Sequence, residues 1–129
     1  MRFYERQFVT RKAANRDVLD KFEKLLNSYF TGDRALHDGL PSVKYFAEEC
    51  FLSPNYFGDL VKKETGKTPQ DHIQSKIIDL AKEELASSED TINEISYHLG
   101  FQYSQHFNRY FKRNVGVTPS QFRKQMAEA

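Results

Sequence analysis

Apolar residues recur along much of this chain at intervals of three and four, which is the period of an amphipathic α-helix. One such segment predicts a helix over residues 16–30, with Phe22 on its apolar face. Another predicts a single helix over residues 69–87, with Ile73 turned inward. The polar stretch 31–41 lacks this period, and we expect it to form a loop. The pattern predicts an all-α protein.

The rest of the chain contains an internal repeat, in which each copy predicts a helix, a short turn and a second helix. At an offset of 50 residues the identical pairs are Phe57/Phe107, Lys62/Lys112, Gly66/Gly116, Thr68/Thr118 and Pro69/Pro119. Upstream the offset is 49, and the matching apolar pairs are Val43/Ile92, Phe46/Ile95, Cys50/Leu99 and Leu52/Phe101. Two copies are too few for a solenoid, so they indicate a duplicated module.

Capping residues mark the ends of these helices. Thr91 and Glu94 have the spacing of a capping box, and Gly100 is well placed to end the helix that they begin. Pro54 suits the first turn of a helix. The other predicted N-caps are Ser42, Ser53 and Ser104.

The second helix of each module carries a polar face opposite its apolar stripe, so this face is directed to solvent. In the first module the face holds Asn55, Gly58, Asp59 and Lys62, and in the second Gln105, Asn108, Arg109 and Lys112. Amide, guanidinium and ammonium groups can read base edges and contact phosphate. An ordinary solvated helix face is the alternative, but the short turn and the duplication favour a DNA-reading face.

Charge is segregated along the chain, although its net value is only +1. Residues 91–125 carry five basic side chains and one acidic one, Glu94. This block suggests a polyanionic partner, although on charge alone a merely basic, solvated face explains it equally well. Residues 74–90 carry two basic and five acidic side chains. The helix over 69–87 would be roughly 27 Å long, close to the spacing of about 34 Å between successive major grooves on one DNA face. We expect it to be a spacer that faces away from phosphate.

Other kinds of chemistry have little support. No apolar run approaches the roughly 20 residues that span a bilayer. The histidines lack metal-ligand spacing, no nucleotide loop or catalytic carboxylate pair occurs, and Cys50 lies on an apolar stripe. We expect a cytoplasmic protein that is not an enzyme and holds no metal ion or other cofactor.

Residues 40–125 resemble the DNA-binding domain of the AraC/XylS family of bacterial transcription regulators. The resemblance rests on LSPNYFGDLVKKETGKTP at 52–69 and on EISYHLGFQYSQHFNRYFKRNVGVTPSQFRK at 94–124. It implies two helix-turn-helix units, homeodomain-like in form, joined by a linker helix and inserted into adjacent major grooves. It also implies transcriptional control, commonly activation through contact with RNA polymerase.

By position, the resemblance assigns base reading to Asn55, Gly58, Asp59, Gln105, His106, Asn108 and Arg109. It assigns phosphate contacts to Ser53, Lys62, Lys63, Ser104, Lys112, Arg113 and Thr118. The sequence departs from the family pattern at Asp59, where a basic residue is usual, at Gly58, which has no side chain, and at Phe51, a turn position often held by glycine. These departures weaken the DNA binding expected of the first module, where Asp59 could either accept a hydrogen bond from cytosine N4 or simply repel phosphate.

Four segments follow: an N-terminal linker region (1–41), a first helix-turn-helix module (42–68), the linker helix (69–90), and a second module with a C-terminal helix (91–129). Residues 3–8, FYERQF, read as a remnant of something larger, and the helix over 16–30 reads as a linker. We therefore favour an excised C-terminal domain over the alternative, a stand-alone two-module protein. A small-molecule effector would then bind a domain absent from this chain. The isolated chain would be a monomer, and the full-length protein a homodimer.

The rival hypothesis is a helical protein-interaction module, for example one that docks on RNA polymerase, with only non-specific DNA affinity.

Overall fold

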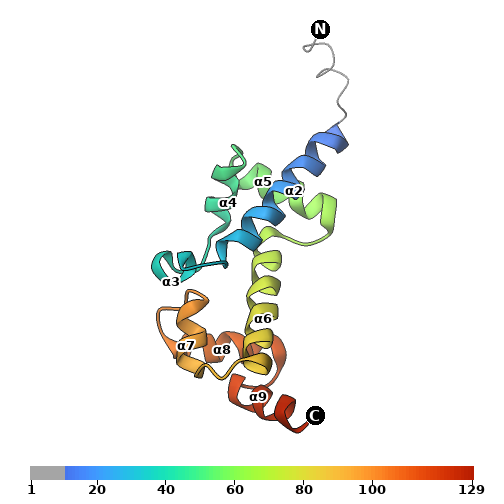
Figure 1. Ribbon diagram of the computed structural model, residues 1–129. Coiled ribbons are helices and arrows are strands. Elements are labelled where there is room, and N and C mark those ends of the chain that lie inside the picture. The colour runs from blue at the N-terminus through green and yellow to red at the C-terminus, as the bar shows by residue number, and fades with distance from the viewer. Residues whose placement is uncertain (1–10) are drawn as a thin grey trace. The chain divides into compact units, whose positions relative to one another are not determined.

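The computed structural model describes residues 11–129, which divide into two compact units (Figure 1). In the first unit, helix α2 (Arg11–Tyr29) packs through its residues up to Ser28 against α4 (Val43–Glu49) and α5 (Pro54–Thr65). The ring of Phe22 lies edge-on to Phe46 and Phe57, with centroids 5.1 and 5.2 Å apart. These three rings form the centre of the first core, because each is almost fully buried.

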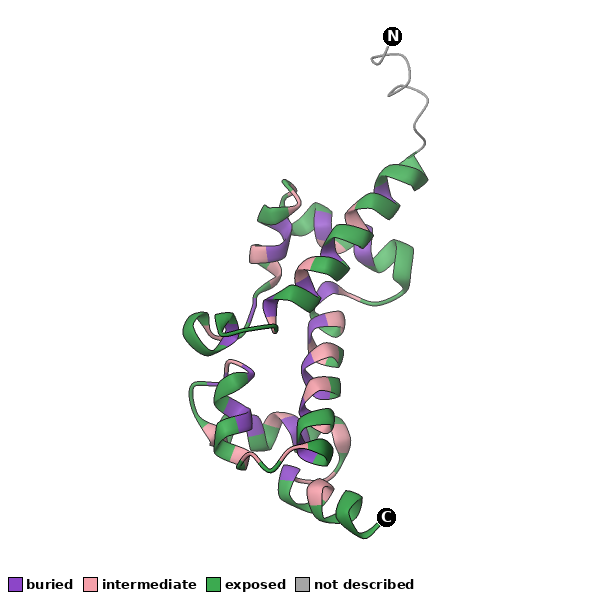
Figure 2. Cartoon of the chain, in the orientation of Figure 1, coloured by how far each residue is buried: buried purple, intermediate pink, exposed green. Residues whose placement is uncertain are grey.

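The second unit contains residues 29–41 and 72–129. Its helices are α3 (Arg34–Asp38), α6 (Pro69–Ser87, from residue 72 onward), α7 (Ile92–His98), α8 (Ser104–Val115) and α9 (Pro119–Glu128). Its fully buried side chains include Ile77, Ile95, Phe107 and Phe111, and Figure 2 shows the buried positions as stripes along the helices. The amphipathic pattern of the sequence is therefore realised within the described residues as an all-helical fold.

Several predicted helix ends are confirmed. The linker helix covers residues 69–87, as its pattern predicts. The hydroxyl oxygen of Thr91 accepts a bond from the Glu94 N–H while the Glu94 carboxylate accepts one from the Thr91 N–H, which completes the capping box. Ser42 and Ser53 cap α4 and α5, and Pro54 stands in the first turn of α5.

One predicted cap is wrong. Ser104 is the first residue of α8, and the N-cap is Tyr103, whose side chain makes no capping hydrogen bond. The start of this helix is set by packing instead. Phe101, which is 5% exposed, contacts Phe107 and Tyr110, and this contact fixes where the chain turns into the helix. Local capping chemistry did not decide this boundary.

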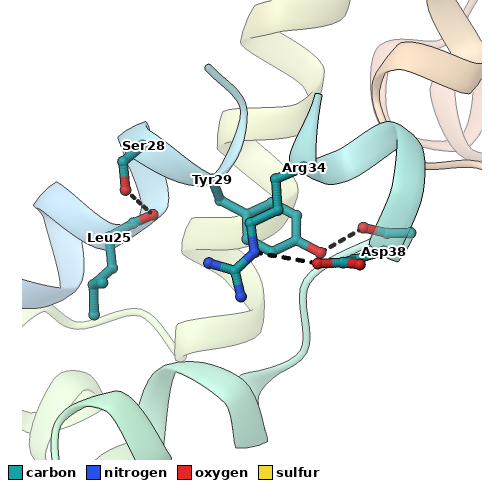
Figure 3. A network of polar contacts seen from close by, with 6 residues as sticks. Leu25, Ser28, Tyr29, Arg34 and Asp38 are labelled. Atoms are coloured by element: carbon teal, nitrogen blue, oxygen red, sulfur yellow. Dashed lines mark hydrogen bonds and ion pairs between the residues drawn. The ribbon is translucent and has the colours of Figure 1, made fainter. Parts of the chain in front are cut away.

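The segment 31–41 is also corrected, because it contains the helix α3 rather than only a loop. Figure 3 shows how it is held: the Tyr29 hydroxyl donates to the Gly39 carbonyl over 2.6 Å, and Arg34 pairs with Asp38. The Arg34 guanidinium also lies 5.1 Å from the centre of the Tyr29 ring. Residues 29–41 thus belong to the second unit, whereas residues 11–28 belong to the first.

Two glycines make the contact between this segment and the turn after α7 possible. A Cβ built on Gly100 would lie 2.7 Å from the Gly39 carbonyl carbon, closer than real Cβ atoms approach. Gly100 also has φ +106, a conformation that side chains rarely adopt. The residue equivalent to Gly100 in the first module is Phe51, which adopts φ 59 with an 87% exposed side chain. The Lys21 ammonium lies 4.8 Å from the centre of the Phe51 ring.

The segment FYERQF, interpreted above as a remnant of something larger, lies outside the described residues. Among the residues that the structure covers, no helix combines the length and the apolar character needed to cross a membrane. Nor does the described part of the chain bring three or more histidine, cysteine, aspartate or glutamate side chains together as a metal site.

Candidate nucleic-acid interface

Helix α8 presents a polar face to solvent because its apolar stripe is fixed in the core. Phe107 and Phe111 are fully buried, so residues about half a turn away must point outward. The exposed side chains include Gln105, Asn108 and Arg109, as the sequence predicts. No acidic residue occurs anywhere in this helix, and its last turn carries Lys112 and Arg113.

An open hollow of about 630 Å³ brings the predicted reading residues of the second module together. It is lined by Tyr103, Gln105, His106, Asn108 and Arg109. Three of these side chains offer amide or imidazole groups that both donate and accept hydrogen bonds, and Arg109 offers a fork of donors. Groups of these kinds can pair with the donors and acceptors that base edges display in the major groove.

A second, smaller hollow of about 310 Å³ lies beside the first, and His106 and Arg109 line both. Its other lining residues are Leu40, Phe101, Tyr110 and Arg113. The Tyr110 hydroxyl is buried without a hydrogen-bond partner among the described residues. Burial raises the pKa of Tyr110 to about 12, because the low-dielectric surroundings disfavour the phenolate. Tyr110 therefore stays neutral at physiological pH, and it lines the second hollow beside His106 and Arg109.

The predicted phosphate contacts are exposed or half-buried, and two of them have a second task. The hydroxyl oxygen of Ser53 accepts a bond from the Tyr56 N–H over 3.2 Å, and that of Thr118 accepts one from the Gln121 N–H over 3.2 Å. Each hydroxyl retains its own proton for donation to a phosphate. Lys62, Lys63, Lys112 and Arg113 are exposed, and Ser104 is half-buried.

The corresponding face in the first module is poorer in donors. Asn55 and Asp59 are exposed on α5, and Gly58 is half-buried. A Cβ on Gly58 would meet nothing within 4 Å, so there is open space for a side chain at this position. Because glycine has none, the middle of the face lacks a hydrogen-bonding group. Asp59 adds a negative charge to this exposed face, and a negative charge repels phosphate. The contrast with α8 indicates that the two modules are unequal.

Arg123 is a basic residue of the second module with a structural task. From α9 its guanidinium donates to the carbonyl oxygens of Leu85 (3.0 Å), Asp90 (2.6 Å) and Ser88 (3.2 Å). These oxygens belong to the last turn of α6 and the segment after it, where helical carbonyls lack partners. The charge of Arg123 is thus used within the fold, which leaves Arg109, Lys112 and Arg113 as the cations that α8 exposes to solvent.

Sequence reasoning missed Tyr103, which shares the hollow with the reading residues and is 53% exposed. The repeat contained a signal for Tyr103. Tyr103 stands 50 residues after Ser53, so it occupies the position at which the first module has a good N-cap residue. It missed Arg123 for another reason: nothing in the local sequence shows which carbonyls a distant guanidinium will reach.

Comparison with known proteins gives consistent results. Residues 46–125 match a family described as "Helix-turn-helix domain". The chain is 32% identical over 104 residues to the uncharacterized HTH-type transcriptional regulator YobQ of Bacillus subtilis, an alignment that covers 78% of this chain and 43% of YobQ. It is 32% identical over 78 residues to the HTH-type transcriptional activator RhaS of Escherichia coli O157:H7, covering 60% of this chain and 28% of RhaS. The chain therefore spans less than half of the length of either relative.

Solved structures share the fold. The C-terminal domain of the two-component response regulator yesN from Fusobacterium nucleatum superposes with a TM-score of 0.73 at 24% identity, covering 83% of this chain and 98% of that one. The DNA-binding domain of the global transcriptional factor AdpA, in complex with a target DNA, gives a TM-score of 0.67 at 19% identity, covering 81% of this chain and 91% of that one.

Proposed function

Because the chain belongs to the AraC/XylS family of helix-turn-helix transcription regulators, we propose that it binds a specific double-stranded DNA sequence through two recognition helices, α5 and α8. The observation that carries this proposal is the hollow on α8, where four predicted reading residues converge without an acidic neighbour on the helix. Direct readout requires such a cluster of donors and acceptors on a helix that fits the major groove.

The second module leads the interaction. Its helix α8 carries Arg109, Lys112 and Arg113, whereas α5 combines Lys62 and Lys63 with two acidic residues. Since phosphate neutralisation supplies most non-specific affinity, the more basic helix contributes more of it. Helix α5 then adds sequence preference with little affinity. The linker helix α6 has 19 residues and is roughly 28 Å long, which suits recognition helices in successive major grooves.

Sequence selection from random double-stranded DNA, followed by titration of the selected site, tests the proposal. Arg109→Ala should weaken binding to that site by about 1–3 kcal/mol and relax preference at one base pair, as loss of a bidentate guanine contact does. Lys112→Ala should weaken binding to all sequences and reduce the salt slope by about one unit. Lys124→Ala is the matched control for loss of one exposed charge away from α8.

Two results would contradict the proposal. Selection that enriches no sequence, with salt-dependent binding to every duplex, would favour the rival protein-interaction module. A selected site whose affinity and base preference were both unchanged in Arg109→Ala would show that the face on α8 is not the reading face.

Regulation by this chain is proposed as activation, since the family resemblance and the activator RhaS both point that way. RNA polymerase would then be a second partner. Transcription from a promoter that carries the selected site should rise when the chain is supplied, and it should fall if the chain is a repressor. The isolated chain is expected to bind as a monomer, which sedimentation of the protein–DNA complex would check.

A further inference from the structure

We propose that Tyr103 is an additional specificity-determining residue, whose ring contacts the 5-methyl group of a thymine next to the bases that α8 reads. The inference rests on the proposed function, because it assumes that the hollow on α8 faces the major groove. It concerns a residue that neither the sequence pattern nor the family resemblance assigned to the interface.

The position of Tyr103 is unfavourable for local stability. It is the N-cap of α8, with extended backbone angles (φ −130, ψ 134), and its side chain accepts no hydrogen bond from the first turn. The equivalent residue of the first module, Ser53, does cap its helix, as do Thr91 and Thr118 in the second unit. Tyr103 therefore stands at a place where a small hydroxyl residue would stabilise the helix.

The ring of Tyr103 is held at the surface instead of being buried. It is 53% exposed, and its edge-to-face contact with His106, at 5.6 Å between ring centroids and an interplanar angle of 84°, limits its motion. Both rings line the hollow that contains Gln105, Asn108 and Arg109. An ordered aromatic surface thus adjoins the hydrogen-bonding groups of the reading face.

Thymine is the base whose chemistry fits this surface. The N-terminal end of a recognition helix is the part that contacts base edges. Thymine alone presents a methyl group in the major groove, and proteins recognise it by apolar contact. Tyr103 lies at that end of α8 and can supply such contact, while Gln105, Asn108 and Arg109 address neighbouring donors and acceptors.

The experiment replaces each thymine of the selected site, one at a time, with deoxyuridine, which removes only the methyl group. Affinity is measured by fluorescence anisotropy. The wild-type protein should lose about fourfold in affinity at one thymine, the change expected for burial of one methyl-sized group. Tyr103→Ser should bind the thymine and deoxyuridine duplexes equally at that position, whereas Tyr103→Phe should still discriminate.

Two controls separate reading from folding. Tyr103→Ser should raise the melting temperature, because serine caps α8, so lost discrimination cannot be blamed on unfolding. Tyr97→Ser removes a tyrosine of α7 that is 40% exposed and lies outside both hollows, and it should keep full discrimination.

The inference is overturned if no thymine position discriminates in the wild type, or if Tyr103→Ser discriminates as the wild type does. It is also overturned if Tyr103→Phe binds the thymine and deoxyuridine duplexes equally, since the hydroxyl rather than the ring would then account for the discrimination. Any of these results, obtained on a site that selection has enriched and that Arg109→Ala weakens, leaves the proposed function standing. Failure to enrich a site would remove the proposed function itself.

Discussion

Replacement of Arg123 by alanine tests whether one guanidinium secures the end of α6. Arg123 donates three hydrogen bonds of 2.6–3.2 Å to backbone carbonyls, and a fourth contact to the Glu84 carbonyl is longer, at 3.5 Å. A hydrogen bond from a charged group contributes about 1.5–3 kcal/mol. Bonds made by one group are not additive, and water can reach part of this half-buried site. We therefore expect Arg123→Ala to lower the unfolding free energy of the second unit by about 2–4 kcal/mol.

The arrangement also predicts that lysine is a poor substitute. Lysine would keep the charge near the C-terminal carbonyls of α6, where a cation contributes about 0.3–1 kcal/mol. It lacks the planar fork that lets Arg123 reach Leu85, Ser88 and Asp90 together. Arg123→Lys should recover only that electrostatic part of the loss.

Thermal unfolding followed by circular dichroism gives the size of the effect, which should be a fall in Tm of roughly 10–20 °C for Arg123→Ala. Hydrogen exchange locates it, since amides near the end of α6 should lose protection before those of α5. Lys124→Ala, one residue further along and exposed, is the matched control. If Arg123→Ala and Lys124→Ala had the same Tm, the inference that the Arg123 hydrogen bonds secure the end of α6 would be refuted.

Three further predictions follow from single residues. In urea titrations the free energy of unfolding of Phe51→Gly should exceed that of Phe51→Ala by about 1 kcal/mol, because φ 59 strains any residue with a Cβ. Equal unfolding midpoints for the two variants would show that the turn relaxes and relieves this strain. Tyr110→Phe should raise the free energy of unfolding by about 1 kcal/mol, since it removes a buried hydroxyl without a partner among the described residues. In absorbance titrations the variant should lack the tyrosine whose pKa burial raises to about 12. A destabilised variant would show that the hydroxyl does have a partner. The backbone N–H of Thr91 lowers the pKa of Glu94 from its ordinary value. The Glu94 carboxylate therefore contributes stability above the ordinary carboxyl range, and this contribution is lost as the pH falls through the lowered pKa. Acid titration of Glu94→Gln should lack this component, and an unchanged acid profile would argue against the capping box.

Local chemistry made much of the helical framework predictable. The start of the linker helix at Thr68 and the capping box at Thr91 follow from hydrogen bonds between residues three positions apart, which sequence spacing reports directly. The exposed face of α8 follows from helical geometry once Phe107 and Phe111 are buried. The base-reading and phosphate assignments on that face remain predictions, which the DNA titrations test.

Contacts between distant residues decided the features that the sequence left open. Segment 31–41 lacks a helical period, yet it is ordered by the bond from Tyr29 to Gly39 and by the close approach of Gly39 to Gly100. Arg123 looks like a DNA-binding cation until its carbonyl partners 33 to 39 residues away are known. Tyr103 replaced Ser104 as the cap because the packing of Phe101 set the register. Apart from the short helix α3, the sequence by itself determined which segments form helices and which face of each is polar, because both depend on neighbours within one or two turns. Only the tertiary structure determined which charges are used within the fold and which aromatic rings remain at its surface, because both depend on partners that the chain brings together from afar.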